Sequence, residues 1–153
     1  MENDHHRRAP APALEVREEV LAVYAEADSR PVERACVRRT ACCRFRLTGK
    51  TPWLTRGEAV VAARAWRAKG RRRIEPRPDG ACPFLDDATG GCGVYAARPL
   101  ACRTHYCREA GGPVPRADVV DLVRKLERIG RRLGGDGAHP LFEAVERELS
   151  SGR

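Results

Sequence analysis

The chain has 153 residues and a formal net charge of +8, and 33% of its residues are charged. That length suits a single domain, although 3 Phe, 3 Tyr, 2 Trp and 1 Met supply few large side chains for a hydrophobic core. No segment approaches the roughly 20 apolar residues of a membrane-spanning helix, and residues 1–10 lack the apolar stretch of a secretory signal. We therefore expect a cytoplasmic protein with no membrane partner.

Arginine supplies almost all of the positive charge, because lysine occurs only at positions 50, 69 and 125. A composition rich in Ala and Arg can also reflect a coding bias of the genome. The net charge by itself therefore gives weak support for a nucleic-acid partner.

The N-terminal part of the chain predicts a tail followed by a helix. Residues 1–12 are polar and then Pro-rich, which is typical of a disordered tail. From Ala13 to about Asp28 the apolar residues mostly follow helical spacing, and the pattern stops before Pro31. We expect this surface helix to open a domain that spans residues 13–110.

A second helix is predicted by its capping signal. Thr55-Arg-Gly-Glu58 forms a capping box, so a helix should run from about Arg56 to Ala68 and end at Gly70. The basic residues that follow it suit the C-terminal end of a helix. The segment lacks the aromatic platforms that proteins binding single-stranded nucleic acid place among their cations.

The central region predicts a small β-hairpin. Cys82-Pro-Phe-Leu and Cys92-Gly-Val-Tyr are short apolar segments on either side of a glycine-rich loop, residues 86–91. Such a hairpin would place Cys82 at the start of one strand and Cys92 at the start of the next.

The C-terminal residues 111–153 predict two helices that pack on the same domain. After a linker at 111–115, apolar residues follow helical spacing from Val119 to Leu133, and Pro140 suits the first position of a short terminal helix. The predicted fold class is therefore mainly α with a short β-hairpin. In this fold, amphipathic helices enclose a small, irregular, cysteine-rich and metal-stapled domain.

The cysteines indicate that the protein binds a metal through thiolates. Seven cysteines in a reducing compartment argue against a disulfide framework, and an odd number would leave one thiol over. Thiolates together with an imidazole are typical ligands of zinc and of iron–sulfur clusters. The candidate ligands in the motif core, residues 36–107, are Cys36, Cys42, Cys43, Cys82, Cys92, Cys102, Cys107 and His105.

The spacing of these residues leaves the type of centre open. No Cys-x2-Cys pair typical of zinc ribbons is present, and the common ferredoxin spacings do not match either. One four-ligand zinc site, two such sites, or one iron–sulfur cluster with spare thiols would all fit. Adjacent cysteines point in different directions in regular structure, so Cys42 and Cys43 cannot easily bind one small ion together.

Two other functional classes remain open from the residues alone. In a redox or transferase enzyme, Cys102 or Cys107 would be made reactive by His105 and nearby arginines. However, neither a redox Cys pair nor a third residue that would orient His105 can be identified, so no catalytic constellation is assigned. The other class is an Arg-rich adaptor that binds nucleic acid around a metal-stabilised core.

An ordered set of motifs resembles a known family. The set comprises Cys36-x5-Cys42-Cys43, Leu54-Thr-Arg-Gly-Glu58, Cys82-Pro-Phe-Leu, Cys92-Gly-Val-Tyr, Arg98-Pro99 and Cys102-Arg103. Over residues 36–107 it resembles the YkgJ-like cysteine-cluster family of zinc- or iron-chelating domains. The resemblance implies metal chelation and says little about a reaction.

One position departs from the family pattern. The family opens with Cys-x2-Cys-x2-Cys-Cys, and Arg39 stands where its second cysteine is expected. We therefore hypothesise that Cys107 or His105 supplies the missing ligand, since both follow Cys102 closely in the chain.

Overall fold

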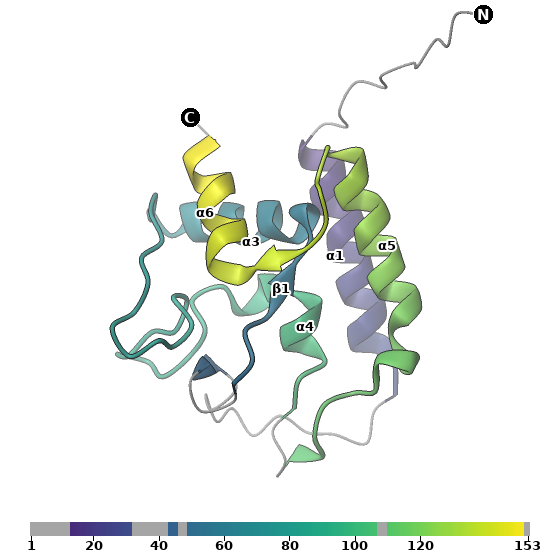
Figure 1. Ribbon diagram of the computed structural model, residues 1–153, viewed down its shortest axis with the longest axis horizontal. Coiled ribbons are helices and arrows are strands. Elements are labelled where there is room, and N and C mark those ends of the chain that lie inside the picture. Colours follow the sequence, from purple (N-terminus) through teal and green to yellow (C-terminus); the bar gives the residue numbers. More distant parts are fainter. Residues whose placement is uncertain (1–12, 32–42, 46–48, 107–109, 152–153) are drawn as a thin grey trace, which may run out of the picture.

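The computed structural model describes residues 13–31, 43–45, 49–106 and 110–151 (Figure 1). Its elements are α1 (Ala13–Ser29), β1 (Trp53–Leu54), α3 (Arg56–Ala68), η2 (Tyr95–Ala97), α4 (Leu100–Arg103), η4 (Arg116–Asp118), α5 (Val120–Arg132), β2 (His139–Pro140) and α6 (Leu141–Ser151). The fold is mainly helical, and β1 and β2 form a short antiparallel sheet, which confirms the predicted fold class. The predicted disordered tail, residues 1–12, lies outside the described residues.

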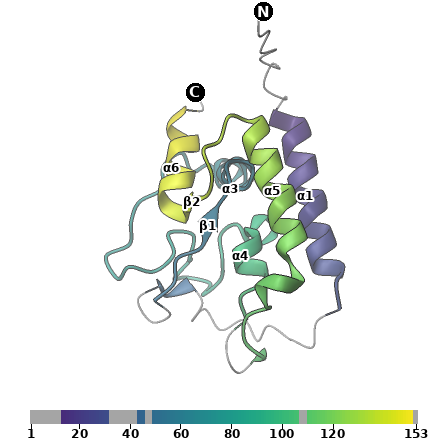
Figure 2. The ribbon, with the colours of Figure 1, turned by 45° about the vertical axis from the view of Figure 1, so that its right-hand side comes forward.

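The helix α3 lies at the centre of the fold. It packs against α1 and α5, which run side by side in opposite directions, and against α6 (Figures 1 and 2). The core between these helices is built from buried aliphatic side chains, and it includes Val16, Val20, Leu122, Leu126, Leu141 and Val145. Among the described residues, none of the helices has the length and apolar character to cross a membrane.

Gly57 allows α3 to approach α1 and α5 closely. A Cβ atom at this position would lie 3.1 Å from Val20 Cγ2 of α1 and 3.1 Å from Ile129 Cγ2 of α5. Those separations are shorter than ordinary van der Waals contact, so a Cβ atom here would force the Val20 and Ile129 side chains to shift by a few tenths of an ångström. Glycine therefore suits the close packing of α3 against α1 and α5.

Most helix bounds agree with the sequence. The helix predicted at 56–68 is confirmed, and Glu58 completes its capping box by accepting the Thr55 backbone N–H at 2.9 Å. The start of α6 differs by one position, because Pro140 pairs with Trp53 in the β1–β2 sheet and the helix begins at Leu141.

The β-structure lies mainly elsewhere than predicted. Between the two cysteine segments only an isolated bridge forms, from Leu85 to Cys92. The Cys82 carbonyl accepts the Leu85 N–H at 3.0 Å in a turn, and the Val94 carbonyl accepts the Ala97 N–H at 2.8 Å. Because both flanks turn immediately, the predicted hairpin shrinks to one bridge and Cys82 does not begin a strand.

We predict that Gly57→Val lowers the free energy of unfolding by about 1–3 kcal/mol, because the added atoms overpack the crossing of three helices. Ala68→Val is the matched control, since Ala68 is exposed at the end of the same helix. Urea denaturation followed by circular dichroism measures both variants. Equal stability of the two variants would contradict the close packing at Gly57.

Candidate metal centre

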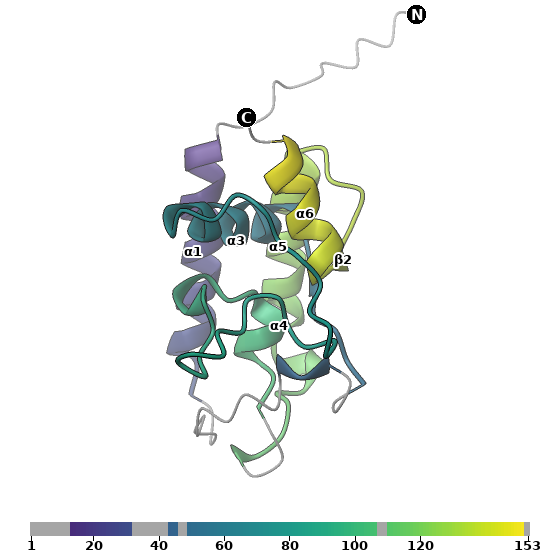
Figure 3. The ribbon, with the colours of Figure 1, turned by 90° about the vertical axis from the view of Figure 1, so that its left-hand side faces the viewer.

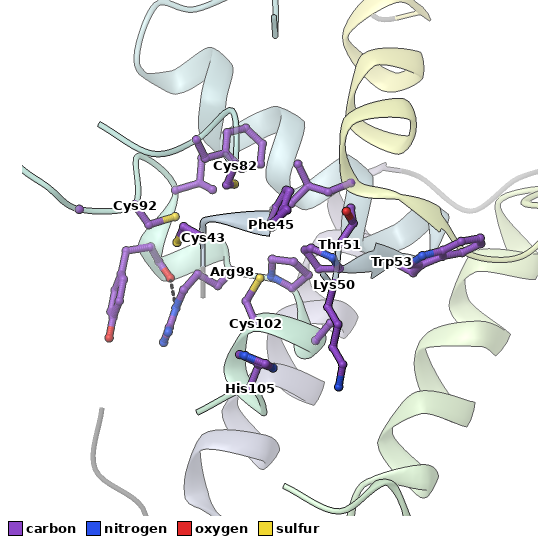
Figure 4. A pocket seen from close by; sticks show the side chains of 18 of the residues that line it. Cys43, Phe45, Lys50, Thr51, Trp53, Cys82, Cys92, Arg98, Cys102 and His105 are labelled. Atoms are coloured by element: carbon purple, nitrogen blue, oxygen red, sulfur yellow. Dashed lines mark hydrogen bonds between the residues drawn. The ribbon is translucent and has the colours of Figure 1, made fainter. Parts of the chain in front are cut away.

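Every described cysteine lines one pocket of about 650 Å³ (Figure 4). Cys43 belongs to the short segment 43–45, and Cys82 and Cys92 belong to the irregular region between α3 and α4, which lies below α3 in the view of Figure 3. Cys102 lies in α4, and His105 follows that helix and lines the same pocket. The fold therefore gathers residues that are widely separated in sequence.

The two cysteine regions touch through the backbone. The Cys82 N–H donates to the Cys43 carbonyl at 2.6 Å. In Figure 4 the side chains of Cys43 and Cys92 point toward one another, while Cys102 and His105 lie further along the pocket. Cys82 is buried, whereas the other three cysteines and His105 are half-buried. Most of these candidate ligands can therefore be reached from the pocket.

The described side chains do not by themselves form a complete metal-binding group. Within residues 13–31, 43–45, 49–106 and 110–151, no three Cys, His, Asp or Glu side chains are grouped closely enough to hold an ion. Cys36, Cys42 and Cys107, the other predicted ligands, lie outside these residues. The structure thus brings Cys43, Cys82, Cys92, Cys102 and His105 to one pocket.

The donor atoms suit the metals that the sequence suggests. Thiolates and imidazoles are the preferred ligands of zinc and iron, whereas calcium and magnesium require oxygen ligands. Among the described residues that line the pocket, none is an aspartate or a glutamate. The lining therefore fits zinc or iron and disfavours hard divalent ions.

Cys102 is positioned by a buried carboxylate. Glu58 is only 3% exposed, and its Oε1 accepts the Leu100 N–H at 2.9 Å and the Tyr24 hydroxyl at 3.4 Å. Its Oε2 accepts the Thr55 N–H at 2.9 Å and the Thr55 hydroxyl at 3.0 Å. Glu58 thereby ties the first residue of α4 to α3 and α1. Burial raises the pKa of the Glu58 carboxyl, while the hydrogen bonds from Leu100 and Thr55 oppose this increase.

Arg103 holds the other side of the same short helix. Its guanidinium lies 4.4 Å from the centre of the Tyr24 ring and donates to Asp28 and to the Ala96 carbonyl, each at 2.6 Å. The Arg103 side chain is only 7% exposed, whereas Asp28 is 55% exposed, so solvent still screens this ion pair. Tyr24 thus contacts both Glu58 and Arg103, and burial raises its pKa well above the ordinary value. Because Leu100 and Arg103 are both anchored, the position of Cys102 between them in α4 is fixed.

The backbone after Cys92 is fixed by close packing. A Cβ atom at Gly93 would lie 3.0 Å from Trp66 Cζ3 and 3.1 Å from the Phe84 carbonyl oxygen. The Trp66 and Phe84 rings pack with their centres 5.1 Å apart. Only glycine lets the chain pass at this distance, which gives a structural reason for the Cys92-Gly93 pair.

Arg77 organises the loop that carries Cys82 and Cys92. It donates to the carboxylates of Asp79 and Asp87 and to the Leu85 carbonyl at 3.0 Å. Hydrogen bonds from Arg77 hold the pKa of Asp79 at about 2. The sequence does not predict the pairing of Arg77 with Asp79 and Asp87, and it indicates only a helix-capping role for Glu58. The Arg77 contacts span 2 to 10 positions and the Glu58–Leu100 contact spans 42, and no capping or turn spacing in the sequence predicts either set.

Comparison with known proteins identifies one family. A family model described as "Putative zinc- or iron-chelating domain", CxxCxxCC, matches residues 34–118. The match spans more than half of the chain and includes all eight predicted ligands. No curated protein and no solved structure matches this chain.

We predict that Glu58→Gln lowers the free energy of unfolding by about 1–3 kcal/mol, because the amide NH2 must face a backbone donor from either Thr55 or Leu100. Glu143→Gln, which changes an exposed carboxylate in the first turn of α6, is the matched control. Thermal and urea denaturation compare the two variants. Equal stabilities would show that the carboxylate network contributes little.

The destabilisation by Glu58→Gln should also depend on pH. Because the pKa of Glu58 is raised in the folded protein, its protonated form is favoured by folding. This contribution is fully present below the pKa of the unfolded chain and is lost as the pH rises through the folded pKa. The stability of the wild type relative to Glu58→Gln should therefore increase on lowering the pH from 7 toward 5. A difference that stays constant over this range would contradict the raised pKa.

Proposed function

We propose, because the chain belongs to the CxxCxxCC family of zinc- or iron-chelating domains, that thiolates from residues 36–43 and 82–107 form a metal centre. The observation that carries the proposal is that Cys43 shares one pocket with Cys82, Cys92 and Cys102. The proposed ligands are drawn from Cys36, Cys42, Cys43, Cys82, Cys92, Cys102, Cys107 and His105. Zinc or an iron–sulfur cluster would be the bound group.

Partial exposure of the thiols favours an accessible centre. Structural zinc sites are usually saturated and enclosed, whereas sites that exchange metal or react keep one side open. Cys43, Cys92 and Cys102 are each half-buried beside the pocket. The proposed centre therefore suits metal sensing, metal delivery or redox work better than a purely structural role.

The charges around the pocket support thiolate ligation. Four thiolates around a divalent ion leave a net charge of −2, which nearby cations stabilise. Lys50 and Arg98 line the pocket, and no acidic side chain is found among its described lining residues. Cations also favour the deprotonated form of a thiol, which is the form that binds metal.

Anaerobic purification, followed by an absorption spectrum and elemental analysis, tests the proposal and identifies the metal. Brown protein that contains iron and acid-labile sulfide would establish a cluster. Colourless protein with bound zinc would establish a zinc site. Protein purified without either metal, and unable to take up zinc or a reconstituted cluster, would refute the proposal.

We predict that Cys82→Ser weakens metal binding by at least about 100-fold, because losing a ligand costs more than the 10- to 100-fold loss typical of an outer-shell residue. Ala101→Ser is the matched control, since it adds a hydroxyl to the lining of the same pocket without removing a thiol. Competition with a chromophoric chelator measures both affinities. Equal affinities in the two variants would exclude Cys82 as a ligand.

The ligand that compensates for Arg39 is tested by two further variants. We predict that His105→Ala or Cys107→Ala reduces the metal bound per chain, since each removes one candidate donor near Cys102. His139→Ala is the control, because that imidazole contacts Asp136 at 2.6 Å and does not line the pocket. Undiminished metal in both variants would show that neither residue replaces the missing cysteine.

A further inference from the structure

Four cations follow the C-terminal end of α3 within a few positions, and we call residues 69–73 the basic segment. The four are Lys69, Arg71, Arg72 and Arg73, and all of them are exposed. The favourable effect of a cation near the negative end of a helix falls off within the last turn. The helix end therefore accounts for Lys69, its C-cap residue, and leaves Arg72 and Arg73 without such a role.

The protein holds the backbone of the basic segment in a defined position. The Trp66 Nε1–H donates to the Arg73 carbonyl at 2.8 Å. Ile74, the next residue, is only 6% exposed and anchors the segment to the hydrophobic core. Cations on a fixed backbone lose less conformational freedom on binding than cations on a loose tail, so the segment is well suited to present its charge to a partner.

The described part of the chain leaves the charge of the basic segment largely unneutralised. There, no ion pair involves its four cationic side chains, whereas Arg56, Arg77 and Arg132 each have a carboxylate partner. Glu75 and Glu146 line a small pocket together with two arginines of the segment, but both carboxylates are exposed. The four cations therefore outnumber these carboxylates, and an anionic partner would neutralise the excess.

The composition of the segment indicates phosphates as the partner groups. Arginine presents a planar fork of donors that matches phosphate oxygens, and most protein–DNA hydrogen bonds go to the backbone. The centre of a protein–protein interface is instead apolar and poor in charge. Trp53 and Tyr95, the exposed large hydrophobic residues of the described chain, line the pocket of the cysteines and lie outside the segment. The segment therefore suits a nucleic-acid backbone better than a protein surface.

A duplex fits this segment better than a single strand. Proteins that bind single strands stack the bases on accessible aromatic rings. Trp66, which contacts the segment, is only 8% exposed, and the Arg71 guanidinium lies over its ring at 5.0 Å from the centre. This ring is therefore closed to a base, whereas the phosphates of a duplex, with one charge per about 1.7 Å of helix axis, can reach the arginines from outside.

We propose that the basic segment binds the phosphate backbone of a double-stranded nucleic acid without reading its sequence. Lys69, Arg72 and Arg73 contact the phosphates, while Arg71 stays on the Trp66 ring. Residues 69–73 are all described, and none of them lines the pocket of the candidate metal ligands. The inference therefore goes beyond the proposed metal centre and does not depend on it.

Fluorescence anisotropy with a labelled DNA duplex of about 20 base pairs measures binding to the full chain as purified. We expect the affinity to fall steeply as salt rises from about 50 to 200 mM, because each phosphate contact releases counterions. A duplex of unrelated sequence should bind within about 3-fold, whereas a single strand of equal length should bind more weakly. An RNA duplex of the same sequence shows which of the two backbones is preferred.

A triple variant locates the contacts. Lys69→Gln/Arg72→Gln/Arg73→Gln should weaken duplex binding by about 10- to 100-fold and reduce the slope of log K against log salt by about 2–3. Arg71 is left in place, so that its contact with Trp66 is retained.

The matched control removes the same number of charges from another face. Its changes are Arg124→Gln, Arg128→Gln and Arg131→Gln, at exposed positions that share one face of α5. In Figure 1, α5 lies at the right of the molecule and the chain leaves the C-terminal end of α3 at the left. Salt screens charges on the far side of the molecule, so the control should lose less than about 3-fold in affinity. Thermal unfolding and metal content should stay unchanged in both triple variants.

Any of four outcomes would overturn the inference. They are the absence of duplex binding at about 50 mM salt, an affinity that does not depend on salt, tighter binding of the single strand, and equal losses in the two triple variants. Polyglutamate that competes as effectively as DNA would also overturn it, because the segment would then favour an acidic protein. Metal-loaded protein that ignores the duplex overturns this inference alone, whereas duplex binding by protein that cannot take up metal overturns the metal centre alone.

Discussion

The Glu58 carboxylate is the interaction on which both the core and the pocket depend. A buried carboxylate is costly unless its oxygens accept hydrogen bonds, and here both oxygens do so. Its donors come from Tyr24 in α1, Thr55 at the start of α3 and Leu100 at the start of α4. The packing of the helices and the position of Cys102 are therefore linked through one side chain.

Three other sets of contacts each fix one short stretch of chain around the pocket. Arg103, the residue after Cys102, is anchored by Asp28, and close packing around Gly93 fixes the chain after Cys92. Arg77 forms hydrogen bonds across a loop that contains little regular secondary structure. Such a region lacks the regular backbone hydrogen bonds of a helix or sheet, so side chains take over that task. Contacts within the protein therefore hold the described cysteines partly in place without any contribution from a metal.

Local patterns in the sequence were sufficient to predict some elements, whereas contacts between distant residues decided the others. The helix at 56–68 followed from Thr55 and Glu58, which are three positions apart. The bond from Glu58 to Leu100 spans 42 positions and has no local signature. Pro140 suits the first position of a helix by sequence alone, and its pairing with Trp53 in the sheet has no local signature either. The pocket shared by five candidate ligands could be anticipated from residue chemistry, whereas its apolar lining and its size required the fold.

The β1–β2 pairing links the C-terminal segment to the cysteine region. The Leu141 N–H donates to the Pro52 carbonyl at 2.9 Å, and both residues line the pocket. The family match ends at residue 118, before β2 and α6. Among the described lining residues, Leu141 therefore comes from outside the matched domain. A substitution at Leu141 would therefore reshape the cavity without altering any of the candidate metal ligands, so the form of the cavity and its set of donors depend on different parts of the chain.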